Sequence, residues 1–102
     1  MNHWPESLPW HDGERKEFNF KYHVISLVKF TGSYGWRDDL WELAILDKDT
    51  EDFVDLPIDA LKEYPAADVG VYGFLNDAEA DRIINEVRLS LIHISEPTRP
   101  LY

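Results

Sequence analysis

The feature that most constrains the fold is a stretch of thirteen residues, 18–30, in which apolar and polar side chains alternate. Aromatic and β-branched residues at a period of two are typical of a β-strand. One face of this strand would carry Phe18, Phe20, Tyr22, Val24, Val28 and Phe30, and the other would carry Lys21, His23 and Lys29. We therefore predict a single strand over residues 18–30.

A second strand is predicted over residues 40–46, Leu-Trp-Glu-Leu-Ala-Ile-Leu, where apolar side chains occupy both faces. Because both faces are apolar, we expect this strand to be central and covered on both sides. It would form a hairpin with the first strand through a loop in which Gly32 and Gly35 can adopt positive φ. A polar turn over residues 47–52 would lead into a short third strand over residues 53–56.

The segments that follow predict a helical end to the chain. Residues 58–64 are compatible with a short helix, and residues 69–75 with a short edge strand or an ordered turn. Asn76 and Glu79 match a capping box, which satisfies free amides at the start of a helix. Beyond them, apolar residues recur at helical spacing, namely Ala80, Ile83, Ile84 and Val87.

These elements predict an α+β fold, in which a small antiparallel β-meander of three or four strands packs against a C-terminal helix. The sheet face that carries Phe20, Tyr22, Val24 and Val28 is expected to pack on Ile83, Ile84 and Val87. Residues 17–88 would form this single domain. Residues 1–16 show no sustained period and are expected to form an irregular arm that tryptophans partly pin to the domain.

The last residues have a different character. Residues 89–99, LSLIHISEPTR, resemble codon by codon the translation of a transposase-type sequencing adapter. We therefore expect residues 89–102 to be an artefact tail, and the natural sequence after Arg88 to differ from the one given.

Composition narrows the classes of function. The chain has no cysteine, no apolar run near the ~18–20 residues of a membrane span, and no signal-peptide pattern at its start, so we expect a cytoplasmic protein. Its net charge is −10, and residues 38–81 hold fourteen acidic residues against two lysines. Such a surface repels phosphates and anionic lipids, so no direct binding to nucleic acid or membranes is expected. A solvated face explains this charge simply, and an acidic surface that engages a basic protein is the sharper hypothesis.

The order of motifs resembles a group of small uncharacterised tailed-phage proteins. The resemblance covers most of residues 18–88 and is carried by residues 24–35, which end in Gly-Ser-Tyr-Gly, by Leu40-Trp-Glu-Leu-Ala-Ile-Leu46, and by Val71-Tyr-Gly-Phe-Leu-Asn-Asp-Ala-Glu79. The long tryptophan-containing N-terminal arm and residues 57–65 depart from that pattern. The resemblance implies an accessory protein in the cytoplasm of a host bacterium, and it assigns no catalytic residue.

No motif predicts catalysis, a metal or a cofactor. The acidic turn over residues 47–52 has Asp52 where a calcium loop needs glycine, and Ile58 where it needs glutamate. Ser33 lies in a glycine-containing loop that lacks the spacing of a nucleophile elbow or a phosphate-binding loop, and only His23 is a candidate base for it. A small hydrolase therefore remains a minor alternative.

The best candidate for a functional surface is the loop after the first strand. It presents Tyr34, Trp36 and Arg37, which are residue types enriched in binding hot spots, followed by Asp38 and Asp39. Alternatively, Trp36 folds down over an open end of the core. From this loop and the acidic charge we expect a non-enzymatic module that binds a basic host or phage protein. A structural or oligomeric phage component is the second hypothesis.

Overall fold

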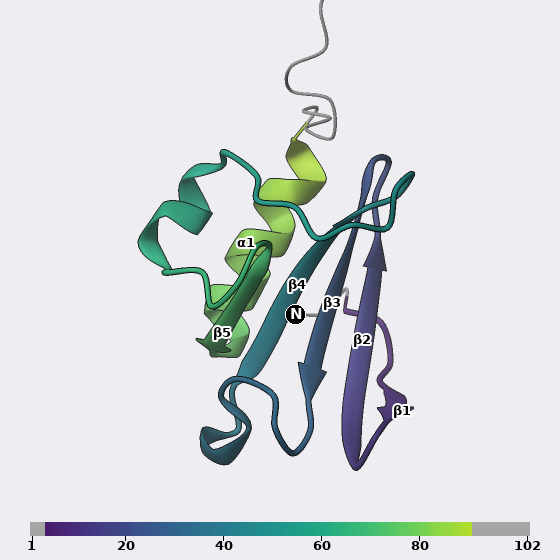
Figure 1. The fold of residues 1–102 in the computed structure, drawn as a ribbon, viewed down its shortest axis with the longest axis vertical. Helices are drawn as coiled ribbons and strands as arrows, with labels where there is room; N and C mark the ends of the chain where they lie inside the picture. The colour runs from purple at the N-terminus through teal and green to yellow at the C-terminus, as the bar shows by residue number, and fades with distance from the viewer. Residues whose placement is uncertain (1–3, 91–102) are drawn as a thin grey trace, which may run out of the picture.

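The computed structural model describes residues 4–90, which form an antiparallel sheet with a helix packed on one side (Figure 1). The sheet has five strands, and each pairs with the next one along the chain. The elements in chain order are β1 (Leu8–Trp10), β2 (Gly13–Asn19), β3 (His23–Lys29), the 3-10 helix η1 (Trp36–Asp38), β4 (Trp41–Asp47), the 3-10 helix η2 (Asp59–Glu63), β5 (Val71–Leu75) and α1 (Asp77–Leu89). The predicted α+β meander with a C-terminal helix is confirmed, with five strands in place of three or four.

The prediction of one strand over residues 18–30 is wrong, because the chain reverses direction at residues 20–22 and continues as β3. This turn contains neither glycine nor proline. The Phe20 N–H donates to the carbonyl of His23 at 2.8 Å, and the distant Lys48 N–H donates to the carbonyl of Tyr22 at 2.9 Å. Because a residue distant in the sequence helps to hold this turn, the turn has no signal in its own residues. The alternation of apolar and polar side chains therefore continues across it without a break.

The irregular arm predicted for residues 1–16 is also wrong where β1 and β2 occupy it. β1 pairs with β2 across a turn at His11 and Asp12. A Cβ atom on Gly13 would lie only 1.8 Å from the carbonyl oxygen of Lys29, so this position requires glycine. This glycine is therefore needed for the close approach of β3 to the start of β2.

Trp4 ties the start of the described chain to the other elements, as expected for a pinned arm. Its indole Nε1 donates a hydrogen bond to Asp81 of α1 at 2.8 Å. Its ring packs edge-on against Phe18 and Trp41, with centroids 5.8 and 5.9 Å away. The N-terminal segment is therefore part of the packed layers.

The remaining elements mostly follow the prediction. The strand expected over residues 53–56 is reduced to a single bridge between Phe53 and Leu46, and β5 takes the edge beside β4 instead. η2 corresponds to the short helix expected over residues 58–64. The capping box is present, with Glu79 N–H donating to Asn76 at 2.8 Å and Asn76 N–H donating to Glu79 at 2.9 Å. Residues 91–102, with most of the adapter-like stretch, lie outside the described residues, so that expectation stays a prediction.

The core lies between α1 and one face of the sheet. The helix contributes the four apolar residues that were predicted from its period, and all four are buried. On β3 and β4 the residues that share this core are odd-numbered, and four of them are fully buried: Ile25, Leu27, Leu43 and Ile45. The expected packing of Tyr22, Val24 and Val28 on the helix is therefore wrong, because none of the three belongs to this core. Phe20 does pack against the core, and the guanidinium of Arg88 on α1 lies 5.7 Å from the centre of its ring. Because β3 is apolar on both faces, alternation alone could not choose between them.

Candidate functional site

The loop predicted to bind a partner connects β3 to β4 and lies at the bottom of Figure 1. Tyr34 is 46% exposed and Trp36 is 38% exposed. Arg37, Asp38 and Asp39 are exposed as well, and no residue of η1 is buried. Trp36 thus reaches solvent and does not fold down to cap the core.

Hydrogen bonds give this loop a defined shape. Gly35 has a φ of 103°, and its carbonyl accepts from Asp38 N–H at 3.1 Å and from Leu40 N–H at 3.0 Å. The Glu42 carboxylate of β4 accepts from Tyr34 N–H at 2.9 Å. The two aromatic side chains are therefore presented on an ordered backbone, which lowers the entropy lost when they bind.

Phe74 joins this surface, although sequence reasoning did not identify it. It has a φ of 59°, which costs a bulky residue on the order of 1–3 kcal/mol, and its side chain is 58% exposed. The pairing of β5 with β4 shifts register at this point, between Trp41 and Leu43, as it does at a β-bulge. Gly73, inside an apolar run, was the sequence signal for a bulge. Which side chain the bulge would expose was not readable from it.

The loop lies directly against this bulge. Phe74 N–H donates to the Tyr34 carbonyl at 3.3 Å, and a Cβ atom on Gly73 would lie 2.3 Å from the Cβ of Tyr34. Tyr34, Trp36 and Phe74 line a hollow of about 200 Å³. We call these three side chains the aromatic patch.

Charged side chains border the aromatic patch. Asp38 lines the same hollow, and the guanidinium of Arg37 lies 5.4 Å from the centre of the Trp36 ring. The Asp39 carboxylate contacts Lys29 at 3.2 Å, but its side chain is 92% exposed. The five residues predicted as a binding surface are therefore brought together in one loop, with its acidic members accessible to solvent.

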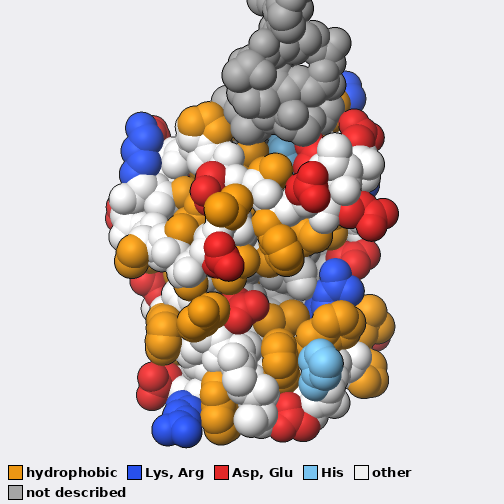
Figure 2. Space-filling view, in the orientation of Figure 1, with side chains coloured by type: hydrophobic (Ala, Val, Ile, Leu, Met, Phe, Trp, Pro, Cys, Tyr) orange, Lys and Arg blue, Asp and Glu red, His pale blue; other side chains and the backbone are white. Residues whose placement is uncertain are grey.

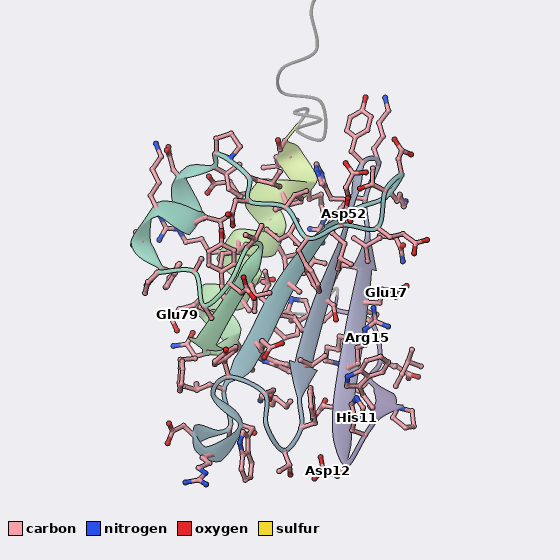
Figure 3. All side chains as sticks on the ribbon, viewed as in Figure 1. His11, Asp12, Arg15, Glu17, Asp52 and Glu79 are labelled. Carbon is pink, nitrogen blue, oxygen red and sulfur yellow. The ribbon has the colours of Figure 1, made fainter. Side chains whose placement is uncertain are left out.

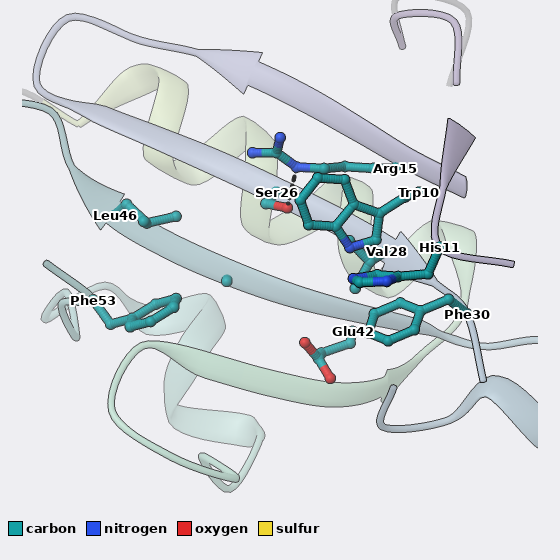
Figure 4. Close-up of a pocket in the computed structure, with 10 residues that line it drawn as sticks. Trp10, His11, Arg15, Ser26, Val28, Phe30, Glu42, Leu46 and Phe53 are labelled. Carbon is teal, nitrogen blue, oxygen red and sulfur yellow. Dashed lines mark hydrogen bonds between the residues drawn. The ribbon is translucent and has the colours of Figure 1, made fainter. Parts of the chain in front are cut away.

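A second candidate surface is the sheet face opposite α1, which no element between residues 4 and 90 covers with a second layer (Figures 1 and 3). Figure 2, drawn from the same side, shows hydrophobic side chains distributed across this view. A hollow of about 330 Å³ lies on this face, with Trp10, His11 and Phe30 towards one end and Phe53 towards the other (Figure 4). We call this surface the open face.

The open face also carries charged groups. Arg15 donates to the Ser26 hydroxyl at 2.9 Å and contacts Glu17 at 2.9 Å, while Glu42 lies on the other side of the hollow (Figure 4). The apolar residues on both faces of β4 predicted that both faces would be covered, and the described chain covers one of them. None of the open-face residues was predicted as a site.

The pair considered for a hydrolase is not brought together. His23 is at the start of β3 and only 3% exposed, whereas Ser33 follows the far end of the strand. Six steps of a strand span about 20 Å. The hydroxyl of Ser33 accepts from Phe30 N–H at 3.1 Å, so it serves the turn.

The acidic turn after β4 is closed by its own side chain. Asp47 Oδ1 accepts from the N–H groups of Asp49 and Thr50, at 2.8 and 3.0 Å. Among residues 4–90 there is no group of three or more histidine, aspartate or glutamate side chains that is arranged to hold a metal ion.

Tyr72 helps to position β5, and with it the aromatic patch. Its hydroxyl donates to Asp55 at 2.7 Å, and the same carboxylate oxygen accepts from Gly70 N–H at 2.8 Å. Burial, and secondly the hydrogen bond to Asp55, raise the pKa of Tyr72 above its ordinary value. The phenol therefore stays a neutral donor at physiological pH and anchors the strand.

None of the helices within the described range is long and apolar enough to cross a membrane. Comparisons of the chain with protein-family models, with curated proteins and with solved structures found no match.

Proposed function

We propose that this chain is a small, non-enzymatic accessory protein of a tailed phage that binds a basic protein through its aromatic patch. The phage assignment rests on the motif order over residues 18–88. The binding assignment rests on one observation above all: Phe74 is held at positive φ on an edge-strand bulge with its ring exposed, beside Tyr34 and Trp36.

The conformation of Phe74 lowers the stability of the fold in two ways. A left-handed backbone is unfavourable for a phenylalanine, and exposing its ring forgoes the free energy of burial. Glycine at the same place would avoid the backbone cost. Strain and exposure at one residue are expected where a side chain is kept for an interaction rather than for the fold. Tyr34 and Trp36 are residue types that recur in hot spots.

The negative charge of the chain indicates a partner with a positively charged surface. Asp38 and Asp39 lie next to the aromatic patch, and the net charge of the chain is −10. A partner with lysine or arginine around an apolar contact would be drawn to this surface, and its attachment would weaken as salt screens the attraction.

The test compares matched variants as bait for host and phage proteins. Phe74→Gly and Trp36→Ala should each lose the captured protein, and charge reversal at Asp38 and Asp39 should lower the salt concentration at which it elutes. Val69→Ala is the control, because Val69 is an apolar residue of similar exposure, 56%, outside the patch. Undiminished capture by a correctly folded Phe74→Gly variant would contradict the proposal.

A further inference from the structure

A separate inference concerns the open face and goes beyond the binding proposed above. Solvent-exposed faces of antiparallel sheets are normally polar. Here the open face exposes Leu8 by 56%, Trp10 by 38% and Phe53 by 52%, around the more buried Val28 and Leu46. Trp10, Val28, Leu46 and Phe53 line one hollow, and exposed apolar surface of this kind is a candidate interaction site.

The charge of the open face differs from that of the whole chain. On the central strands β2, β3 and β4, the charged side chains on this face are Arg15, Glu17 and Glu42. Arg15 and Glu17 already contact each other. A chain with a net charge of −10 repels a second copy of itself over most of its surface, and the open face is where that repulsion is small.

The register of the strands arranges these charges in a line. Arg15 pairs with Val28 on the neighbouring strand, and Val28 pairs with Glu42 on the strand after it. Neighbouring strands are about 4.8 Å apart, so the positive and the negative residue flank Val28 at equal distances. All three residues line the hollow of the open face (Figure 4).

We propose that two copies of this chain pack open face to open face, about a twofold axis that runs parallel to β3 above Val28. Rotation about this axis places Arg15 of one copy opposite Glu42 of its partner, and the reverse pair forms by symmetry. Val28 and Phe30, which lie on the axis, meet their own counterparts. An axis perpendicular to the strands would instead oppose Arg15 with Arg15 and Glu42 with Glu42, so the charges select the parallel axis.

The geometry suits the packing of two sheets. Face-to-face sheets keep their strands nearly aligned and interdigitate apolar side chains across a layer ~10 Å thick. The hollow of about 330 Å³ between the Trp10 and Phe53 ends can receive such side chains. The dimer would therefore give β4 the cover on its second face that its sequence predicts.

The test is sedimentation of the full chain over a range of concentrations, with charge-swapped variants. The wild type should show a monomer–dimer equilibrium. Arg15→Glu alone and Glu42→Arg alone each oppose like charges twice, which should raise the dimer Kd by at least about 100-fold. Mixing these two variants should restore a dimer, because the chain with glutamate at both positions then faces the chain with arginine at both positions.

The double variant Arg15→Glu/Glu42→Arg should also dimerise, and it should not pair with the wild type. Lys62→Glu is the matched control for the single variant Arg15→Glu, because it also replaces a positive charge with a negative one, on η2, where the side chain is 71% exposed, and it should leave the Kd unchanged. Circular dichroism checks that each variant is folded.

Two results would overturn the proposal. If the wild type remains monomeric up to several hundred micromolar, a second copy does not cover the open face. Another protein, or residues outside the described range, would then cover it. A dimer that survives in both folded single variants would use a different surface or a different axis.

Discussion

The two faces of the sheet are both apolar, yet they have different roles. On the face towards α1, Ile25, Leu27 and Leu43 are fully buried in one core with the helix. On the open face, Val28 and Ala44 line a hollow, and large rings beside them such as Trp10 and Phe53 remain exposed. A hydrophobic pattern therefore shows which residues are favoured to be buried, but it does not show which element buries them.

The largest expected effect lies in the covered layer. Ile84 is fully buried in the core, so Ile84→Asp places a carboxylate there with no designed partner. Burying a carboxyl group there, charged or neutralised, costs on the order of several kcal/mol, which is a large part of the typical 5–15 kcal/mol stability of a domain, so we expect the chain to unfold. Thermal melting followed by circular dichroism measures this. A cooperative transition at the wild-type temperature would refute the packing of α1 on the sheet.

A matched pair of substitutions compares the faces directly. Leu27→Ala, on the covered face, should destabilise the chain by about 2–5 kcal/mol, because it leaves a cavity in a closed core. Leu46→Ala, on the open face, should cost less than about 1.5 kcal/mol, because Leu46 is partly exposed already. Urea unfolding of dilute protein gives both values. Equal losses would mean that the open face is covered within the monomer.

The substitution Phe74→Gly should increase the stability of the fold, in contrast to the substitutions above. Removing a bulky residue from a φ of 59° relieves strain, and little burial is lost from a side chain that is 58% exposed. We expect stability to rise by about 0.5–1 kcal/mol. Phe74→Ala keeps the strain and serves as the control. A clear loss of stability in the glycine variant would assign the ring to the fold rather than to binding.

The smallest expected effect is a pH dependence of the stability of the fold, caused by Asp12 at the edge of the open face. Hydrogen bonds from the Thr31 hydroxyl and N–H to the Asp12 carboxylate lower the pKa of Asp12 below its ordinary value of 3.8. Because the folded-state value is the lower one, the carboxylate stabilises the fold above pH ~4, and this contribution is lost as the pH falls through the folded-state pKa.

The melting temperature of Asp12→Asn should therefore lie slightly below that of the wild type at pH 7, and the difference should shrink below pH ~3.8. Asp52→Asn removes an exposed carboxylate from the opposite end of the sheet (Figure 3) and is the control. A difference for Asp12→Asn that stays constant down to pH 2 would show that the charge of Asp12 does not stabilise the turn.

Some features of the fold were readable locally because their causes are local. The capping box at Asn76 and the helical period up to Val87 depend on residues three or four positions apart. The exposed loop was readable because Gly32 and Gly35 interrupt the strand pattern and can adopt the positive φ that a turn needs. By contrast, the turn at residues 20–22 is fastened by Lys48 from another part of the chain. Its local residues gave no reason to break the strand.

The candidate surfaces follow the same division. Tyr34 and Trp36 were recognisable by residue type in a loop. Phe74 joined them only because the β5 bulge turns its side chain outwards beside the loop. The line from Arg15 through Val28 to Glu42 depends on the register of three strands, and the position of the turn between β2 and β3 sets half of that register.

By itself the sequence determined an α+β meander, a capped C-terminal helix and an acidic chain with an exposed aromatic loop, because short-range periodicity, capping and charge suffice for these. Only the tertiary structure decided which face of β3 meets α1. With apolar residues on both faces, the choice depends on how two layers fit together, and no local pattern contains that information.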